Sequence, residues 1–85
     1  MGSVIVTFRI MPESVETDLD SLEKAVIEEV KPQRLKRLPI AFGLNAIQII
    51  KYVDEKEGEM DRITEKIKKI KGVKEVEVTD LTRSL

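Results

Sequence analysis

The sequence predicts an α+β fold in which two helices lie on one face of a four-stranded antiparallel sheet. Two observations support this prediction. Segments with alternating apolar residues and segments with helical apolar spacing follow one another in the order strand, helix, strand, strand, helix, strand. Each helical segment has a single apolar stripe, and one shared sheet face is the surface that can cover both stripes.

The first strand and the first helix are predicted from residues 4–10 and 17–30. Every second residue of 4–10 is apolar, which places one apolar face on a core. Pro12 is expected to end this strand because it has no N–H to donate to a neighbour. In 17–30 apolar residues recur at spacings of three and four, and Thr17 or Asp18 is the expected cap at the start.

The centre of the chain predicts two strands joined by a bend. Residues 34–40 predict a strand at an edge of the sheet, because Pro39 interrupts the hydrogen-bond ladder of a central strand. Residues 41–43 form the bend, and residues 44–53 predict the longest strand. Alternation along this strand places Ile47 and Ile49 on one face, and Ala46, Ile50 and Tyr52 on the other.

The second helix and the last strand complete the chain. Residues 59–71 repeat apolar residues every three or four positions, with acidic residues at the start and lysines at the end, as the helix dipole favours. Gly72 is the expected left-handed residue after this helix. Residues 73–78 predict the final strand, and residues 79–85 a short polar tail. The βαββαβ order is that of a ferredoxin-like sandwich, formed here by residues 1–85 as a single domain.

The amino-acid composition excludes several classes of function for this chain. The chain of 85 residues has no Cys and no His, which excludes disulfides, thiolate nucleophiles, Ser–His pairs and imidazole metal sites. The formal net charge of −1 argues against a protein that coats nucleic acid. No apolar run approaches the roughly 20 residues of a membrane span, so a cytoplasmic protein is expected. We expect no catalytic residue, no metal ligand and no cofactor.

Three function classes remain open from the residues alone: an RNA-binding sheet, a small-molecule regulatory domain and a protein-docking module. An RNA-binding sheet of this fold stacks bases on aromatic residues of its central strands. Phe8 belongs to the core set and residues 73–78 have no aromatic residue, although residues 31–37 include four basic ones. Direct nucleic-acid binding is therefore not the expected function.

The stretch Pro-Ile-Ala-Phe-Gly-Leu at residues 39–44 resembles the Pro-Ile-(Ala/Gly)-Phe-Gly-(Leu/Ile) signature of the elongation factor 1-beta family. The opening strand followed by Met-Pro-Glu-Ser at 11–14 is similar to the archaeal branch, as is the Lys-Gly-Val of 71–73 before a valine-rich strand. The resemblance spans essentially the whole chain. It implies a ferredoxin-like fold and a factor that speeds replacement of GDP by GTP on the GTPase elongation factor 1-alpha.

The resemblance also implies partner-binding residues. Phe42 is the expected apolar wedge, with Pro39 and Gly43 shaping the loop around it; the alternative is that Phe42 packs the end of the core. Arg83 is the only basic residue among the last seven and takes the place of the C-terminal Lys of eukaryotic relatives. The alternative interpretation is that Arg83 is a solvated residue of the tail without a partner-binding role. No acid or base catalyst is needed, because binding that favours the nucleotide-free GTPase weakens nucleotide binding reciprocally.

Two further features bear on partners. Archaeal relatives often have acidic residues before the signature, whereas this chain has Lys36 and Arg37, which changes the charge presented to a partner. Apolar residues such as Ile5 are expected on the open face of the sheet. The GTPase or a second copy of the chain, in a homodimer, are the two candidates to cover them.

Overall fold

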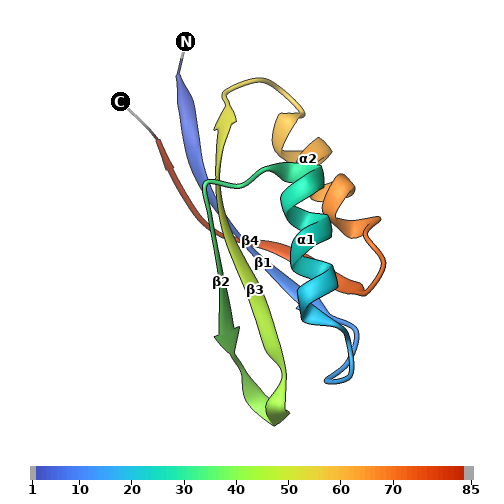
Figure 1. Ribbon diagram of the computed structural model, residues 1–85. Coiled ribbons are helices and arrows are strands. Elements are labelled where there is room, and N and C mark those ends of the chain that lie inside the picture. Colours follow the sequence, from blue (N-terminus) through green and yellow to red (C-terminus); the bar gives the residue numbers. More distant parts are fainter. Residues whose placement is uncertain (1, 84–85) are drawn as a thin grey trace.

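The computed structural model describes residues 2–83 and has the predicted order of elements. The strands are β1 (Ser3–Pro12), β2 (Arg34–Pro39), β3 (Asn45–Asp54) and β4 (Val73–Arg83); the helices are α1 (Leu19–Val30) and α2 (Glu59–Lys68). The strands form one antiparallel sheet in the order β2-β3-β1-β4, and both helices cover the same face (Figure 1). The prediction of a ferredoxin-like α+β sandwich is confirmed.

The core lies between the sheet and the two helices. In β1 the alternate residues Val6, Phe8 and Ile10 are fully buried. Phe8 and Ile10 pair across the ladder with Ile49 and Ile47 of β3, which are also fully buried. The helices add the apolar stripes that their spacing predicts: Leu22, Val26 and Val30 from α1, and Ile63 and Ile67 from α2. Alternation therefore assigned the buried face of β1 correctly. For β3 it only separated two sets of residues, and the structure shows that Ile47 and Ile49 belong to the core.

Asp18 is the residue that caps α1. One of its carboxylate oxygens accepts the backbone N–H of Ser21 at 3.2 Å, and the other accepts the Ser21 hydroxyl at 2.8 Å. These two hydrogen bonds stabilise the ionised carboxylate and lower the pKa of Asp18. Thr17 instead accepts the backbone N–H of Ser14 at 3.1 Å, so it closes the preceding turn. At the other end Lys31 has a left-handed φ of 51°, and Pro32 follows.

The predicted tail is wrong, because β4 continues to Arg83. Residues 79–83 remain in the sheet, where Leu81 pairs with Val6 and Arg83 with Val4. The register shifts at Thr79, an extra residue on β4 that forms a bulge and breaks the two-residue alternation. Because of this bulge, the alternating apolar pattern in the sequence stops at Val78. The strand itself continues, because β1 still has backbone groups free to pair with residues 80–83. The remaining tail residues, 84 and 85, lie outside the described part of the chain.

Other element ends also differ from the predictions. β1 extends through Met11 to Pro12, where the register with β4 shifts, and such an irregularity of the ladder tolerates a proline. α2 ends at Lys68, three residues earlier than expected, and a turn leads into β4. Gly72 has the expected positive φ, 97°, but it lies in this turn rather than directly after the helix.

Candidate functional site

A tight loop connects β2 and β3 at one end of the sheet (Figure 1). Ile40 donates its N–H to the carbonyl of Leu44 at 2.8 Å, and Leu44 donates to the carbonyl of Ala41 at 3.3 Å. Between these bonds Phe42 and Gly43 have φ angles of 63° and 76°, both in the left-handed region. Two consecutive residues with positive φ reverse the chain within a few residues.

Phe42 lies at the apex of this loop with 93% of its surface exposed. The alternative in which it packs the end of the core is therefore wrong. A left-handed conformation costs a non-glycine residue roughly 1–2 kcal/mol. Residues in such sparsely populated backbone conformations persist where the surrounding structure holds them, and they cluster at binding and catalytic sites.

Pro39 and Gly43 lie on either side of Phe42 in the chain, at the two ends of the loop region. Pro39 is the last residue of β2 and pairs with Asn45 on an edge strand, where a missing N–H is tolerated. A Cβ added at Gly43 would meet only the Cγ1 of Val15, at 4.0 Å, which is ordinary van der Waals contact. Glycine is therefore favoured there by the positive φ and not by lack of space.

Val15 is a residue of this region that the sequence analysis did not single out. It lies in the connection between β1 and α1, is 63% exposed, and approaches Gly43 from there. Its only signal in the sequence is an apolar residue within the polar run Glu13-Ser14-Val15-Glu16. Val15 and Phe42 together give this end of the molecule an exposed apolar tip.

Arg83 lies at the opposite end of the sheet from Phe42. It pairs with Val4 at the end of β4, and its Nε is 3.6 Å from Oε1 of Glu55. Val4 pairs with Val53, eight residues along β3 from Asn45, which corresponds to about 27 Å of strand. The molecule is 42 Å long in its longest dimension. The structure thus brings Pro39, Phe42 and Gly43 together and separates Arg83 from them.

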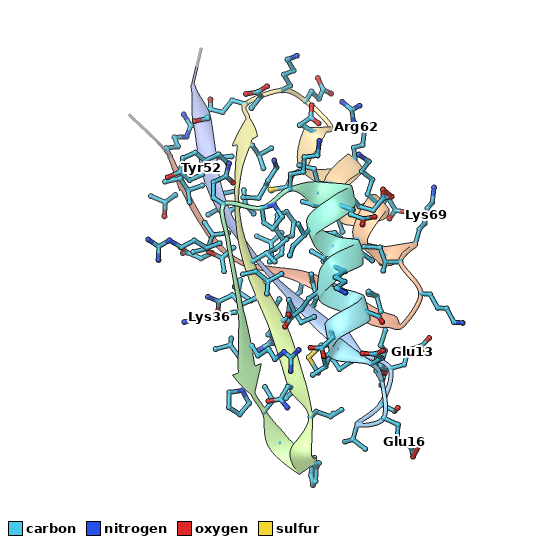
Figure 2. The ribbon with its side chains drawn as sticks, viewed as in Figure 1. Glu13, Glu16, Lys36, Tyr52, Arg62 and Lys69 are labelled. Carbon is cyan, nitrogen blue, oxygen red and sulfur yellow. The ribbon has the colours of Figure 1, made fainter. Side chains whose placement is uncertain are left out.

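The basic residues before the loop point to two different faces. Arg37 faces α1, where its guanidinium binds the carboxylates of Asp20 and Glu23. These two acceptors raise the pKa of Arg37. Lys36, next to it in the strand, points to the face of the sheet away from the helices (Figure 2). Lys36 and Arg37, which stand where archaeal relatives often have acidic residues, therefore add one cation to the open face and two intramolecular ion pairs.

No group of three or more acidic side chains in residues 2–83 is placed to hold a metal ion. Over the same residues, no helix is long and apolar enough to cross a membrane.

An exposed apolar tip is typical of a protein-binding domain, and the comparisons with known proteins identify its class. The family described as "EF-1 guanine nucleotide exchange domain" matches residues 5–83. The chain is 37% identical to elongation factor 1-beta of Methanothermobacter thermautotrophicus over 98% of both chains. It is 40% identical to elongation factor 1-beta of Methanococcoides burtonii, again over 98% of both chains. It is 38% identical to elongation factor 1-beta of Archaeoglobus fulgidus, over 95% of this chain and 97% of the relative. This chain belongs to the family of EF-1 guanine nucleotide exchange domains, and its function is guanine nucleotide exchange in translation elongation.

Proposed function

We propose that residues 1–85 form a single exchange domain that promotes GDP release and GTP loading on elongation factor 1-alpha in the cytoplasm. Phe42 is its principal contact. The observation that carries this assignment is the exposure of Phe42, 93%, in a loop whose backbone is held in a left-handed conformation.

The activity is binding chemistry without a bond-breaking step. A factor that binds the nucleotide-free GTPase more tightly than the loaded form lowers nucleotide affinity by the same factor. It does so by disturbing the contacts that hold Mg²⁺ or the phosphates. An apolar wedge held in position by a rigid loop is sufficient for this, and no cofactor is required.

The loop is suited to this task because its conformation is set before the partner arrives. Two backbone hydrogen bonds, from Ile40 to Leu44 and from Leu44 to Ala41, close it around Phe42. A loop whose backbone is already held in its binding conformation loses little conformational freedom on binding. Aromatic residues are also prominent among the few residues that dominate interface energies, each worth about 2 kcal/mol or more.

Arg83 provides a second, distant contact in this proposal. Its side chain is 77% exposed, and its neighbour Glu55 holds it only through a surface ion pair. Such pairs are worth about 0–1 kcal/mol, so a partner carboxylate or phosphate can replace Glu55 at small cost. Contacts at both ends require a GTPase surface that reaches both ends of the domain.

The test is the rate at which fluorescent GDP leaves an archaeal elongation factor 1-alpha, with and without this protein. We expect a large acceleration by the wild type and a loss of about thirtyfold in exchange efficiency for Phe42→Ala, the equivalent of about 2 kcal/mol. Ile27→Ala, at an exposed apolar residue on α1, is the matched control and is expected to retain full activity. Melting curves verify that both variants fold.

Three outcomes separate the parts of the proposal. Absence of acceleration by the wild type contradicts the exchange assignment to this partner. Acceleration that survives Phe42→Ala removes the tip from the mechanism. Arg83→Ala is expected to lower the exchange efficiency less than Phe42→Ala does, because a solvent-exposed charge contributes less to binding than an aromatic side chain that becomes buried in the interface. An exchange rate unchanged by Arg83→Ala removes Arg83 from the interface.

A further inference from the structure

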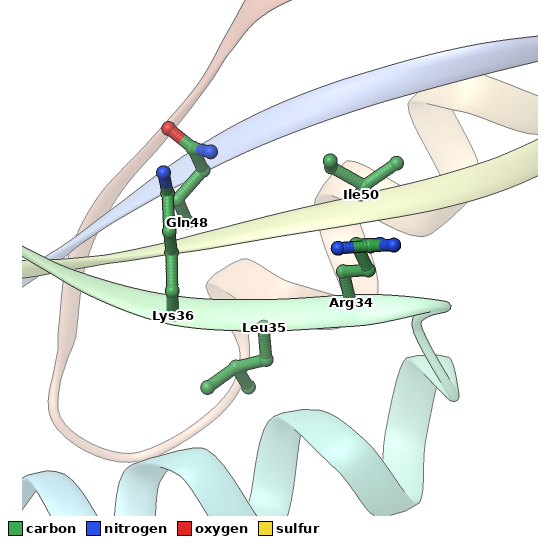
Figure 3. A pocket seen from close by; sticks show the side chains of 5 residues that line it. All are labelled: Arg34, Leu35, Lys36, Gln48 and Ile50. Carbon is green, nitrogen blue, oxygen red and sulfur yellow. The ribbon is translucent and has the colours of Figure 1, made fainter.

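The sheet face away from the helices is uncovered and carries opposite charges at its two edges. The β2 edge presents Arg34 and Lys36, which point away from the helices, whereas Leu35 between them points toward α1 (Figure 3). The β4 edge presents acidic residues that the register places on the same face: Glu75, Glu77 and Asp80, which pair with Met11, Arg9 and Thr7 of β1.

The register arranges this face in rows that run from β2 to β4. One row contains Arg34, Ile50, Thr7 and Asp80, and the next contains Lys36, Gln48, Arg9 and Glu77. A further row, beyond the start of β2, contains Tyr52, Ile5 and Thr82. Each of the two charged rows therefore begins with a cation on β2 and ends with an anion on β4. In the second row the anion, Glu77, also forms an ion pair with Arg9 of the same chain, so Asp80 is the anion without such a neighbour in its row.

The two central strands contribute the apolar part of this face. Ile5 and Ile50 are half-buried, and Tyr52 is 52% exposed on the side opposite the helices (Figure 2). A shallow groove of about 330 Å³ runs beside them, lined by Arg34, Lys36, Gln48 and Ile50. An apolar strip flanked by two rims of opposite charge is a self-complementary surface.

We propose that this open face is the interface of a homodimer in which two copies pack sheet against sheet about a two-fold axis parallel to the strands. Rotation about such an axis places β2 of one copy over β4 of the other, and β3 over β1. Arg34 then faces Asp80 of the second copy, Lys36 faces its Glu77, and Tyr52 faces its Ile5. Each contact occurs twice, as a two-fold interface requires.

Charge selects this arrangement over the alternatives. A two-fold axis that lies in the interface and runs across the strands places β2 over β2 and β4 over β4, which brings like charges together. The axis along the strands also places Gln48 of the second copy over Arg9, whose guanidinium binds Glu77 within its own chain. Opposite potentials across the face fix both the orientation and the register of the pair.

The size of the face predicts a weak dimer. Four strands about 4.8 Å apart and rows about 6.8 Å apart give a face of roughly 20 by 25 Å. This is less than the about 800 Å² per partner of a standard stable interface, so dissociation is expected in the micromolar range. The loop with Phe42 lies beyond these rows at the end of the sheet, and it remains outside the proposed interface.

The test is sedimentation equilibrium over a concentration series at low and high salt, with no GTPase present. We expect a monomer–dimer equilibrium that shifts toward monomer as salt rises, because exposed ion pairs are screened. Arg34→Glu and Asp80→Lys are each expected to weaken dimerisation about tenfold or more, since each change brings two pairs of like charges together. Lys24→Glu, on the exposed surface of α1, is the matched charge reversal and leaves the equilibrium unchanged.

The symmetry makes a sharper test available. Arg34→Glu and Asp80→Lys combined in one chain restore both contacts with reversed polarity, and an equimolar mixture of the two single variants forms a heterodimer. A monomer at every concentration overturns the proposal, as does a double variant no tighter than the singles. A monomeric wild type that binds single-stranded RNA, with binding lost in Arg34→Glu, assigns the face to nucleic acid instead.

Discussion

Phe8 and Phe42 are the two phenylalanines of this chain, and their environments are opposite. Phe8 lies in the centre of β1, fully buried between Ile49 and Val78 on the neighbouring strands. Phe42 lies at the apex of the β2–β3 loop, 93% exposed. The same side chain stabilises the fold at one position and, in our proposal, binds a partner at the other.

The comparison shows how this small domain separates folding from function. The centre of the sheet is held by the burial of apolar side chains from β1, β3 and both helices. The loop is held by backbone hydrogen bonds and two left-handed residues, so its apolar side chain remains available. The loop therefore tolerates side-chain changes that the sheet centre does not.

The largest expected effect is that of Phe8→Ala on stability. Truncating a fully buried phenylalanine costs about 3–5 kcal/mol, which is a large part of the 5–15 kcal/mol typical of a whole domain. Phe42→Ala removes almost no buried surface, so its free energy of unfolding should stay close to that of the wild type. Urea unfolding of both variants measures the difference, and equal losses at the two positions would refute the comparison.

A smaller effect is expected from the backbone of the loop. Gly43→Ala places a β-carbon at a φ of 76°, where the only neighbour is at 4.0 Å, so its cost is conformational strain. That strain is about 1 kcal/mol and lowers the melting temperature by roughly 4–8 °C in a domain of this size. Phe42→Asn, which tolerates the left-handed region, should be more stable than Phe42→Ala. If Gly43→Ala leaves the melting temperature unchanged, the loop backbone is not held rigidly.

The smallest effect concerns Asp18, which lies outside both regions and acts through the start of α1. Its pKa is lowered in the folded state, so its stabilisation is present above the unfolded pKa of about 3.9 and is lost as pH falls through the lower folded value. Asp18→Asn should therefore melt slightly earlier than the wild type at pH 7, with the difference vanishing in strong acid. A difference that persists in acid would assign the effect to packing and not to the carboxylate charge.

Much of the fold was predictable because it depends on neighbours in the sequence. The period of two in β1 identified the buried face that includes Phe8, and Thr17 or Asp18 marked the start of α1, where the structure shows Asp18 as the cap. The extension of β4 was not predictable, because the bulge at Thr79 breaks the period on which the prediction depends. Its pairing with β1 joins residues more than sixty positions apart.

The loop residues Pro39, Phe42 and Gly43 were chosen because the stretch 39–44 resembles the signature of the elongation factor 1-beta family, whereas the residues alone left it open whether Phe42 binds a partner or packs the core. Local spacing and backbone preference thus determined the order of elements, the core residues and the position of the bend. Only the tertiary structure decided that Phe42 is exposed, that Arg83 lies at the far end of the sheet, and that cations and acids occupy opposite edges of the open face. These properties depend on which strands are neighbours, and strand order is set by packing across the whole chain.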